Sequence, residues 1–483
     1  MVCLLAGFPE HMAGTSRRGF LKQGMIVAGG LGLGLAAWSR FARSGAMPGP
    51  SSALGPLKPV NDLTTGLPIL KLPNGFRYHS FAWAGERLGD GYTSPAAADG
   101  MGVVSDIDGI VTLIRNHELR GSSGPIGDPR KAWGVTGGGT TTLKFDTRKE
   151  RLVDSNISLG GTNNNCAGGV TPWGTWLSCE EGVVTPELMH HGVELRQKFW
   201  HHENVQKSHG YVFEVKPEGE IDPQPIVAMG QFYHEAAAID PDSGIVYMTE
   251  DRDPYAGLYR YIPDIPGKLK AGGKLQMLKA EGFKHLISSI PLNKSFGISW
   301  VDIQEPGRGS TPGTHDGEGV VAQGLLAGAT AFLSLEGCAY HQGSVYFTSK
   351  QGGDARAGQI YRLNLDQNSI SLIFEATERN GFSGMDNIVV SPNGSLMICE
   401  DRLGLLRNGQ FIAGLDKNGD LFAFCQTNPD LKAKYAGFDL RSTAVPAEWA
   451  GACFSADGRW MFANLYSPGM SFAITGPWGD GPV

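Results

Sequence analysis

The sequence lacks a long, uninterrupted hydrophobic run. A helix needs about 20 consecutive apolar residues to cross a membrane. The longest apolar stretch, residues 25–38, is shorter and is broken by Gly29, Gly30, Gly32 and Gly34. We therefore expect no stable membrane anchor in the mature protein.

The sequence also lacks a surplus of basic residues. It contains 41 Lys and Arg against 48 Asp and Glu, which gives a formal net charge of −7 at pH 7. Nucleic-acid binding relies on basic side chains that neutralise phosphates, so this composition excludes a nucleic-acid partner. A net acidic protein is instead suited to concentrating cations.

The seven cysteines lack the spacing of a CxxC motif. Such spacing marks zinc sites and redox-active pairs, and a chain of this size does not need disulfides for stability. We expect most cysteines to be buried as small hydrophobic residues, and the sequence leaves open whether any of them pair. Cys179 and Cys399 stand apart because each directly precedes a glutamate at the end of a strand-like run.

The N-terminus carries the pattern of an export signal. Residues 16–22, SRRGFLK, form a twin-arginine motif, and the small residues Ser44, Gly45 and Ala46 suit cleavage. We predict that the twin-arginine export machinery recognises residues 1–46, and that residues 47–483 form a single domain, periplasmic or secreted. Removing the signal would leave a net charge of about −11. Proteins that use this route fold before they cross, often around a metal, so a metal site is expected.

Turn-forming residues are abundant, with 69 Gly and 28 Pro, which predicts many short strands. One unit recurs six times: a turn glycine, a short strand and, in most copies, an acid. The copies begin at Gly109, Gly174, Gly244, Gly343, Gly394 and Gly458. Another short strand precedes each glycine and a third follows each copy, and four antiparallel strands form a propeller blade. We predict an all-β, six-bladed β-propeller with long inter-strand insertions, because the units exceed the ~40–50 residues of common blades.

Acidic residues recur at the ends of the predicted strands. Some open the predicted innermost strand of a blade: Glu235, Glu336 and Asp386. Others end the adjacent strand: Glu118, Glu180, Glu250 and Glu400. Innermost strands line the channel of a propeller, so these carboxylates should meet near its axis, where they would repel each other unless a cation lay among them. The alternative is that each acid accepts hydrogen bonds within its own blade.

The run TPWGTWLSCEE, residues 171–181, delivers a thiol and two carboxylates to the end of one predicted strand. Carboxylate oxygens suit calcium or magnesium, while one thiolate among them suits a transition metal such as iron, manganese or zinc. The alternative is a strand that ends in a solvated Glu-Glu pair beside a half-buried Cys179.

Taken together, these motifs resemble the PhoX family of secreted bacterial alkaline phosphatases. The resemblance covers most of the mature chain and rests on Asn116-His117-Glu118, residues 164–181, His234-Glu235-Ala236, Glu336-Gly337 and Cys399-Glu400-Asp401. It implies a six-bladed propeller that holds iron and calcium at one end of its channel and hydrolyses small-molecule phosphate esters. We expect a monomer.

Carried onto this sequence, the resemblance implies that Cys179 binds ferric iron and that Glu235 and Glu336 bind iron or calcium. The remaining metal ligands would be Glu118, Glu180, Glu250 and Asp251. The expected catalytic residues are Asn116, near the phosphate, Glu118 and Lys350. A cluster of cations can neutralise both the attacking and the leaving oxygen of a phosphoryl transfer.

The sequence departs from the family where an Arg-Pro-Glu run is expected and Ser334-Leu335-Glu336 stands instead. Arginine is the natural bidentate partner of phosphate. Its substitutes near strand ends would be Lys350, Arg252 or Arg402. Two other functions stay open: a calcium-dependent propeller hydrolase such as a lactonase, and a binding propeller that keeps metal ions only for stability.

Overall fold

Strands dominate the chain in the computed structural model, which describes residues 54–121, 124–186, 205–219, 221–377, 382–401, 409–440, 448–480 and 483. These residues belong to one unit, Met47–Val483. The predicted export signal and Arg402 lie outside the described residues. None of the described helices is long and apolar enough to cross a membrane.

Six antiparallel hairpins contain the six glycines that mark the predicted repeats. Each hairpin joins an inner strand to a second strand, in the order β4 (Ala98–Ile107) with β5 (Ile110–His117), β8 (Asn165–Val170) with β9 (Trp176–Glu180), β11 (His234–Ile239) with β12 (Val246–Glu250), β16 (Leu335–His341) with β17 (Ser344–Ser349), β20 (Met385–Val390) with β21 (Leu396–Glu400), and β26 (Trp449–Phe454) with β27 (Trp460–Leu465). The turn glycines have φ between 69° and 84°, a conformation that glycine adopts at no steric cost. The predicted assignment of one glycine to each hairpin is confirmed.

Outer strands extend these hairpins into blades. They are β6 (Thr136–Asp146) and β7 (Arg151–Gly161), β10 (Val212–Val215), β13 (Leu258–Pro263) and β14 (Gly273–Ala280), β18 (Gln359–Asn364) and β19 (Ser369–Glu375), β22 (Phe411–Leu415) and β23 (Leu421–Thr427), and β28 (Met470–Thr475) with β3 (Arg77–Phe81). Because β3 comes from the N-terminal part of the chain and pairs with β28, the two ends of the described chain complete one blade.

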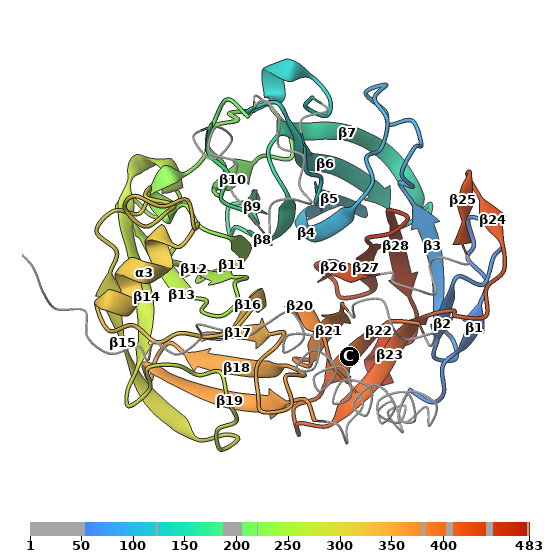
Figure 1. Cartoon of the computed structure of the whole chain (residues 1–483). Coiled ribbons are helices and arrows are strands. Elements are labelled where there is room, and N and C mark those ends of the chain that lie inside the picture. The colour runs from blue at the N-terminus through green and yellow to red at the C-terminus, as the bar shows by residue number, and fades with distance from the viewer. Residues whose placement is uncertain are drawn as a thin grey trace, which may run out of the picture. The chain divides into compact units, whose positions relative to one another are not determined.

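The inner strands form a closed ring. In the described residues β4 contacts β8, β8 contacts β11, and the contacts continue through β16, β20 and β26 back to β4. Figure 1 shows these strands around a common centre with the other strands outside them. The predicted β-propeller is therefore confirmed, with six inner strands in the part of the chain that the structure describes.

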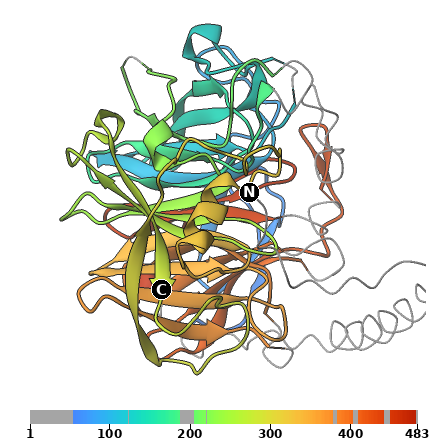
Figure 2. The ribbon, with the colours of Figure 1, turned by 60° about the vertical axis from the view of Figure 1, so that its left-hand side comes forward.

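The remaining strands modify individual blades. In the long segment between β14 and β16, β15 (Ser295–Asp302) pairs with both β14 and β19 and joins two blades into one sheet. The same segment contains α3 (Gly319–Leu326), which packs against β14 and faces the viewer in Figure 2. Elsewhere, β1 (Lys58–Val60) and β2 (Leu70–Leu72) extend the sheet of β23, and β24 (Lys434–Tyr435) pairs with β25 (Phe438–Asp439).

Apolar side chains fill the spaces between neighbouring blades. Leu113 and Phe145 of the first blade pack with Trp460 and Phe462 of the last, and the rings of Phe145 and Phe462 meet edge to face at 5.6 Å. Burial of such large side chains contributes about 2 kcal/mol each. The core therefore holds the blades rigidly against one another, and this fixes the positions of their strand ends.

Candidate metal centre

Every inner strand carries a β-bulge near its beginning. In the third blade His234 pairs with Glu250, and the next pair is Ala237 with Met248, so the inner strand contains one extra residue. The same shift occurs at the start of the other inner strands. A bulge re-aims the side chain beside it. In five inner strands the bulge follows the first residue and so gives the second residue a direction that regular alternation would not give. In β26 it lies one residue later, after Ala450.

Two sets of residues occupy equivalent places in the six hairpins. The second-position set consists of the second residues of the inner strands: Asp99, Cys166, Glu235, Glu336, Asp386 and Ala450. The post-strand set consists of the residues that follow the second strands: Glu118, Glu181, Asp251, Lys350, Asp401 and Tyr466. The acids and the thiol of both sets, with Glu448 and Lys350, form what we call the acidic cluster.

Three groups within the acidic cluster bring possible metal ligands within 4.8 Å of one another. The first group is Cys166, Glu181 and Glu235; the second is Glu235, Glu336 and Asp386; the third is Asp386, Asp401 and Glu448. Because Glu235 and Asp386 are shared, the groups are continuous. The Cys166 Sγ lies 3.0 Å from Glu235 Oε1 and 3.8 Å from Asp99 Oδ2, so one thiol stands among carboxylates.

Several of these carboxylates are buried with one oxygen that has no hydrogen-bond partner in the described structure. Within the described residues, Asp99 Oδ1 and Glu235 Oε2 are buried and accept no hydrogen bond. Burial raises the pKa of Glu235 well above its usual range, and Glu336 and Asp386 raise it further. Burial likewise raises the pKa of Asp99, with help from Glu118. An unpaired buried carboxylate is costly, and a bound cation would remove this cost. The donor set therefore fits metal ions.

Two basic side chains reach the acidic cluster in the described structure. Lys350 Nζ donates to Asp386 Oδ2 at 2.9 Å and to Asp401 Oδ2, and it lies 3.5 Å from Glu336 Oε1. Burial alone would lower the pKa of Lys350, but these carboxylates raise it well above its usual value. Arg120 donates to Glu118 and to Asn164. The structure thus places the predicted residues Glu118, Glu235, Glu336 and Lys350 together, and Asp251 acts electrostatically on Glu336.

Cys179, the predicted iron ligand, lies elsewhere. It is fully buried in an apolar cluster with Leu177, Val212 and Met248, and burial raises the pKa of its thiol. It is also paired with Val212 within the sheet of β9 and β10. The structure therefore does not bring Cys179 to the acidic cluster, and the thiol that lies there is Cys166.

Glu180 and Glu250 also differ from their predicted roles, and both accept hydrogen bonds within the structure. The Glu180 carboxylate accepts from the backbone N–H of Asn163, Gly210 and Tyr211 and contacts His209 Nδ1 at 2.7 Å. Glu250 Oε2 accepts from Gly257 N and Tyr259 OH, and burial raises the pKa of Glu250 to about 7. The next residue in each case, Glu181 or Asp251, belongs to the acidic cluster. The hydrogen bonds of Glu180 and of Glu250 Oε2 are those that the blade-local alternative expects, while Glu250 Oε1 is buried without a partner in the described structure.

Asn116 was predicted to lie near the phosphate. Both the nitrogen and the oxygen of its side-chain amide form hydrogen bonds within the protein. Its Nδ2 donates to the carbonyls of Cys166 and Ala167 at 3.0 and 2.7 Å. Its Oδ1 accepts from Trp176 Nε1 and Ser178 Oγ. Asn116 therefore holds the backbone that carries Cys166, and it is a positioning residue. Arg252, a predicted substitute for the missing arginine, also forms hydrogen bonds within the protein, because its guanidinium donates to the carbonyls of Asp316 and Gly317.

We predict opposite effects for two adjacent glutamates. Glu180→Gln should leave the metal content unchanged and destabilise the fold by about 3 kcal/mol, because the carboxylate accepts backbone N–H groups in a buried site. Glu181→Gln should weaken metal binding about 10- to 100-fold and, compared with the unchanged protein in the metal-free state, should lose little stability. Elemental analysis and denaturant unfolding of both variants check this. Loss of metal from Glu180→Gln alone would show that the post-strand set is not the ligand set.

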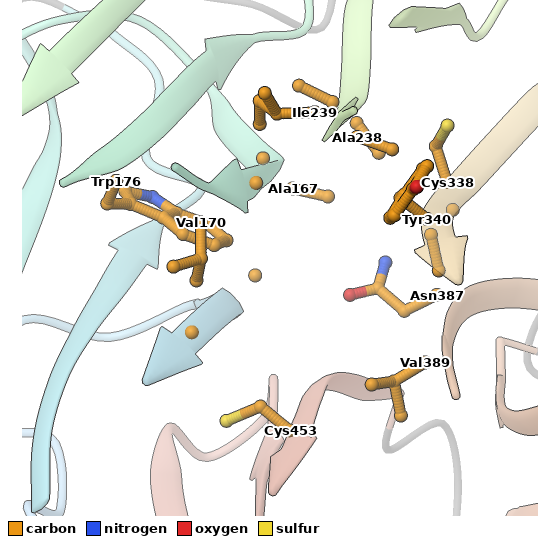
Figure 3. A pocket seen from close by; sticks show the side chains of 18 of the residues that line it. Ala167, Val170, Trp176, Ala238, Ile239, Cys338, Tyr340, Asn387, Val389 and Cys453 are labelled. Carbon is orange, nitrogen blue, oxygen red and sulfur yellow. The ribbon is translucent and has the colours of Figure 1, made fainter. Parts of the chain in front are cut away.

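The central channel adjoins the acidic cluster. It has a volume of about 400 Å³ and is lined from the third residue of each inner strand onward. Figure 3 shows Cys338, Asn387 and Cys453 around it. Asn387 connects the channel wall to the cluster, because its Nδ2 donates to Asp386 Oδ1 and its Oδ1 accepts from Gly451 N.

The third residue of each inner strand is Gly or Ala except Asn387 in β20, and these small residues allow the strands to approach closely. A Cβ on Gly337 would lie 2.5 Å from the backbone nitrogen of Ile388, and a Cβ on Gly100 would lie 2.5 Å from the Cα of Ala167. Such contacts are too short for any side chain. Close approach at this level brings the second-position set together.

Comparisons with known proteins identify the family and agree with the propeller fold. The family model for alkaline phosphatase PhoX matches residues 130–469. Among solved structures, the chain is similar to Pseudomonas fluorescens PhoX in complex with vanadate, a transition state analogue, with 18% identity, a TM-score of 0.61, and coverage of 88% of this chain and 98% of that chain. A gluconolactonase from Xanthomonas campestris is 11% identical, with coverage of 89% of this chain and 97% of that chain and a TM-score of 0.41. No curated protein sequence matches significantly.

Proposed function

Because the chain belongs to the alkaline phosphatase PhoX family, a family of phosphoric monoester hydrolases, we propose that it is an exported phosphatase. We propose further that its acidic cluster binds iron and calcium. The observation that carries the proposal is the buried Cys166 thiol beside Glu235 and Asp99, each of which has one buried oxygen without a hydrogen-bond partner in the described structure. The residues matched by the family include all three groups of the cluster.

The two proposed metals suit different groups of the acidic cluster. A thiolate with carboxylates favours a transition metal, so Cys166, Glu181 and Glu235 would hold iron. Carboxylates alone favour calcium, so Glu235, Glu336 and Asp386 would hold calcium. Once bound, the cations would supply charge neutralisation for the attacking and leaving oxygens of the phosphate ester.

The protein's own side chains would bind and orient the phosphate. Arg120 has 36% of its side chain exposed, against 20% for Lys350, so its guanidinium lies at the solvent side of the cluster. Arginine presents paired N–H groups that match phosphate oxygens. We therefore assign to Arg120 the role of the arginine that is absent before Glu336, with Glu118 holding its guanidinium.

Export and oligomeric state belong to the same proposal. The twin-arginine pattern of residues 16–22 supports passage through the twin-arginine machinery to the periplasm or the medium. The expected protein is a monomer of residues 47–483 with a small-molecule phosphate ester as substrate.

Substrate assays with natively exported protein test the proposed function. We expect release of inorganic phosphate from a phosphomonoester, less from a phosphodiester, and no hydrolysis of a lactone. Activity on the lactone with none on the phosphomonoester would favour the calcium-dependent hydrolase. Full metal content with no hydrolysis of any substrate would favour the binding propeller.

A further inference from the structure

The two ends of the acidic cluster are neutralised in different ways. At the end with Cys166, Glu181 and Glu235, the nearest basic group in the described structure is Arg120, 3.9 Å from Glu181 Oε2. At the other end an ammonium group lies directly among the carboxylates, because Lys350 contacts Glu336, Asp386 and Asp401. Arg120 therefore lies at the edge of the first group, while the Lys350 ammonium lies among the carboxylates of the other end.

Lys350 occupies the oxygens that a metal ion would use. Asp386 and Asp401 are two of the three members of the third group, and Lys350 Nζ donates to one oxygen of each. In the second group it donates only to Asp386, because Glu336 Oε1 lies 3.5 Å away and accepts no hydrogen bond in the described structure. Glu448, the third member, also acts electrostatically on Lys350. An ammonium has three N–H donors, which matches the three carboxylates within its reach. A cation and the Lys350 ammonium would compete for the same place.

The position of Lys350 in its hairpin supports this interpretation. It belongs to the post-strand set, where the equivalent residues Glu118, Glu181, Asp251 and Asp401 are acidic. Its backbone N–H donates to the Ser334 carbonyl at 2.9 Å, which fixes the start of the side chain in the fourth blade. From there the side chain reaches Asp386 and Asp401 of the fifth blade. One blade thus supplies a cation where most of the others supply a carboxylate.

We propose that Lys350 is a built-in cation that replaces a metal ion at the third group, so that this protein binds metal only at the first and second groups. The inference rests on the proposed metal cluster, but it concerns the number of bound ions and not the reaction. It also gives Lys350 a positioning role in place of the predicted contact with the substrate.

Removing the ammonium should open a metal site. We expect Lys350→Met, equilibrated with calcium and then dialysed, to bind about one more calcium ion per chain than the unchanged protein, as measured by elemental analysis. Adding Asp401→Asn to this variant should abolish the extra ion. Lys144→Met is the matched control, because Lys144 pairs with the exposed Glu218 and its loss should not change the calcium content.

The outcomes separate this inference from the proposed function. An unchanged calcium content in Lys350→Met overturns the inference, even if the unchanged protein hydrolyses phosphomonoesters. An extra calcium ion supports it, even if no phosphatase activity is found. If the variant accumulates as folded protein only when calcium is added, the inference is also supported. If it fails to fold with excess calcium as well, or if it loses only its affinity for vanadate, the inference is wrong.

Discussion

Replacing Cys166 with alanine should remove most of the bound iron and lower phosphatase activity at least about 100-fold. The thiol stands 3.0 Å from Glu235 Oε1 within the first group of the acidic cluster, and a thiolate among carboxylates is the feature that selects a transition metal there. Glu235 and Glu181 alone would form an oxygen-only site that favours calcium. Iron content and turnover should therefore fall together.

Cys179→Ala is the matched control for this experiment. Cys179 lies in the apolar cluster of the third blade and its neighbours, so its loss should leave the iron in place. The variant should be destabilised by about 1–2 kcal/mol, because removal of the sulfur leaves a small cavity. Elemental analysis with denaturant unfolding distinguishes the two effects. Iron loss in Cys179→Ala and retention in Cys166→Ala would restore the assignment made from the sequence.

Stripping the metal ions from the unchanged protein should lower its melting temperature by about 5–10 °C. Ligands that bind only the folded state stabilise it by mass action, and the buried oxygens of Asp99 and Glu235 would lose their partners. Addition of calcium and iron should restore both the melting temperature and the activity. An unchanged melting temperature after removal of all metal would contradict this role.

The stability of the stripped protein should depend on pH in a defined direction. Burial raises the pKa of Asp99, Glu235 and Glu336 in the folded state. The stability that such groups contribute is fully present below their unfolded pKa of about 4 and is lost as the pH rises through the raised folded pKa. The stripped protein should therefore melt at lower temperatures as the pH increases above about 5.

The metal-loaded protein should show the opposite trend. Protons compete with metal ions for carboxylates and thiolate, so the loaded protein should lose stability as the pH falls. Thermal melts at several pH values, with a chelator or with calcium and iron, compare the two trends. A flat profile for the stripped protein would mean that its buried acids are already paired.

The blade pattern could be predicted from the sequence because its signals are local. Each hairpin turn needs a residue with positive φ, and Gly109, Gly244 and the other repeat glycines supply it. Short strands on both sides of each turn complete the signal. The number of hairpins and the place of each glycine therefore followed from neighbouring residues alone.

The ligand set could be predicted only in part, because it depends on the bulges. Glu180 and Glu181 are adjacent acids at a strand end, and their sequence does not tell which one turns toward the axis. Pairing of Asn165 with Glu180 places Glu180 within the sheet and Glu181 beyond it. Cys166 could have been predicted from the sequence. It lies at the start of an inner strand, as Glu235 and Glu336 do, and this position is the feature that selected those two glutamates.

For other members of the acidic cluster, no short sequence motif predicts their place in it. Glu448 lies just before β26 and outside the repeated unit, and its contact group is assembled by the packing of two blades. The pairing of Lys350 with Asp386 and Asp401 also joins separate blades. Such long-range contacts follow from closure of the ring and not from any short motif.

The most direct test of the metal assignment is an anomalous-difference map, recorded at the iron absorption edge from crystals of the natively exported protein. We expect a strong peak at bonding distance from Cys166 Sγ and from the carboxylates of Glu181 and Glu235. A peak beside Cys179, or no peak within the acidic cluster, would contradict it.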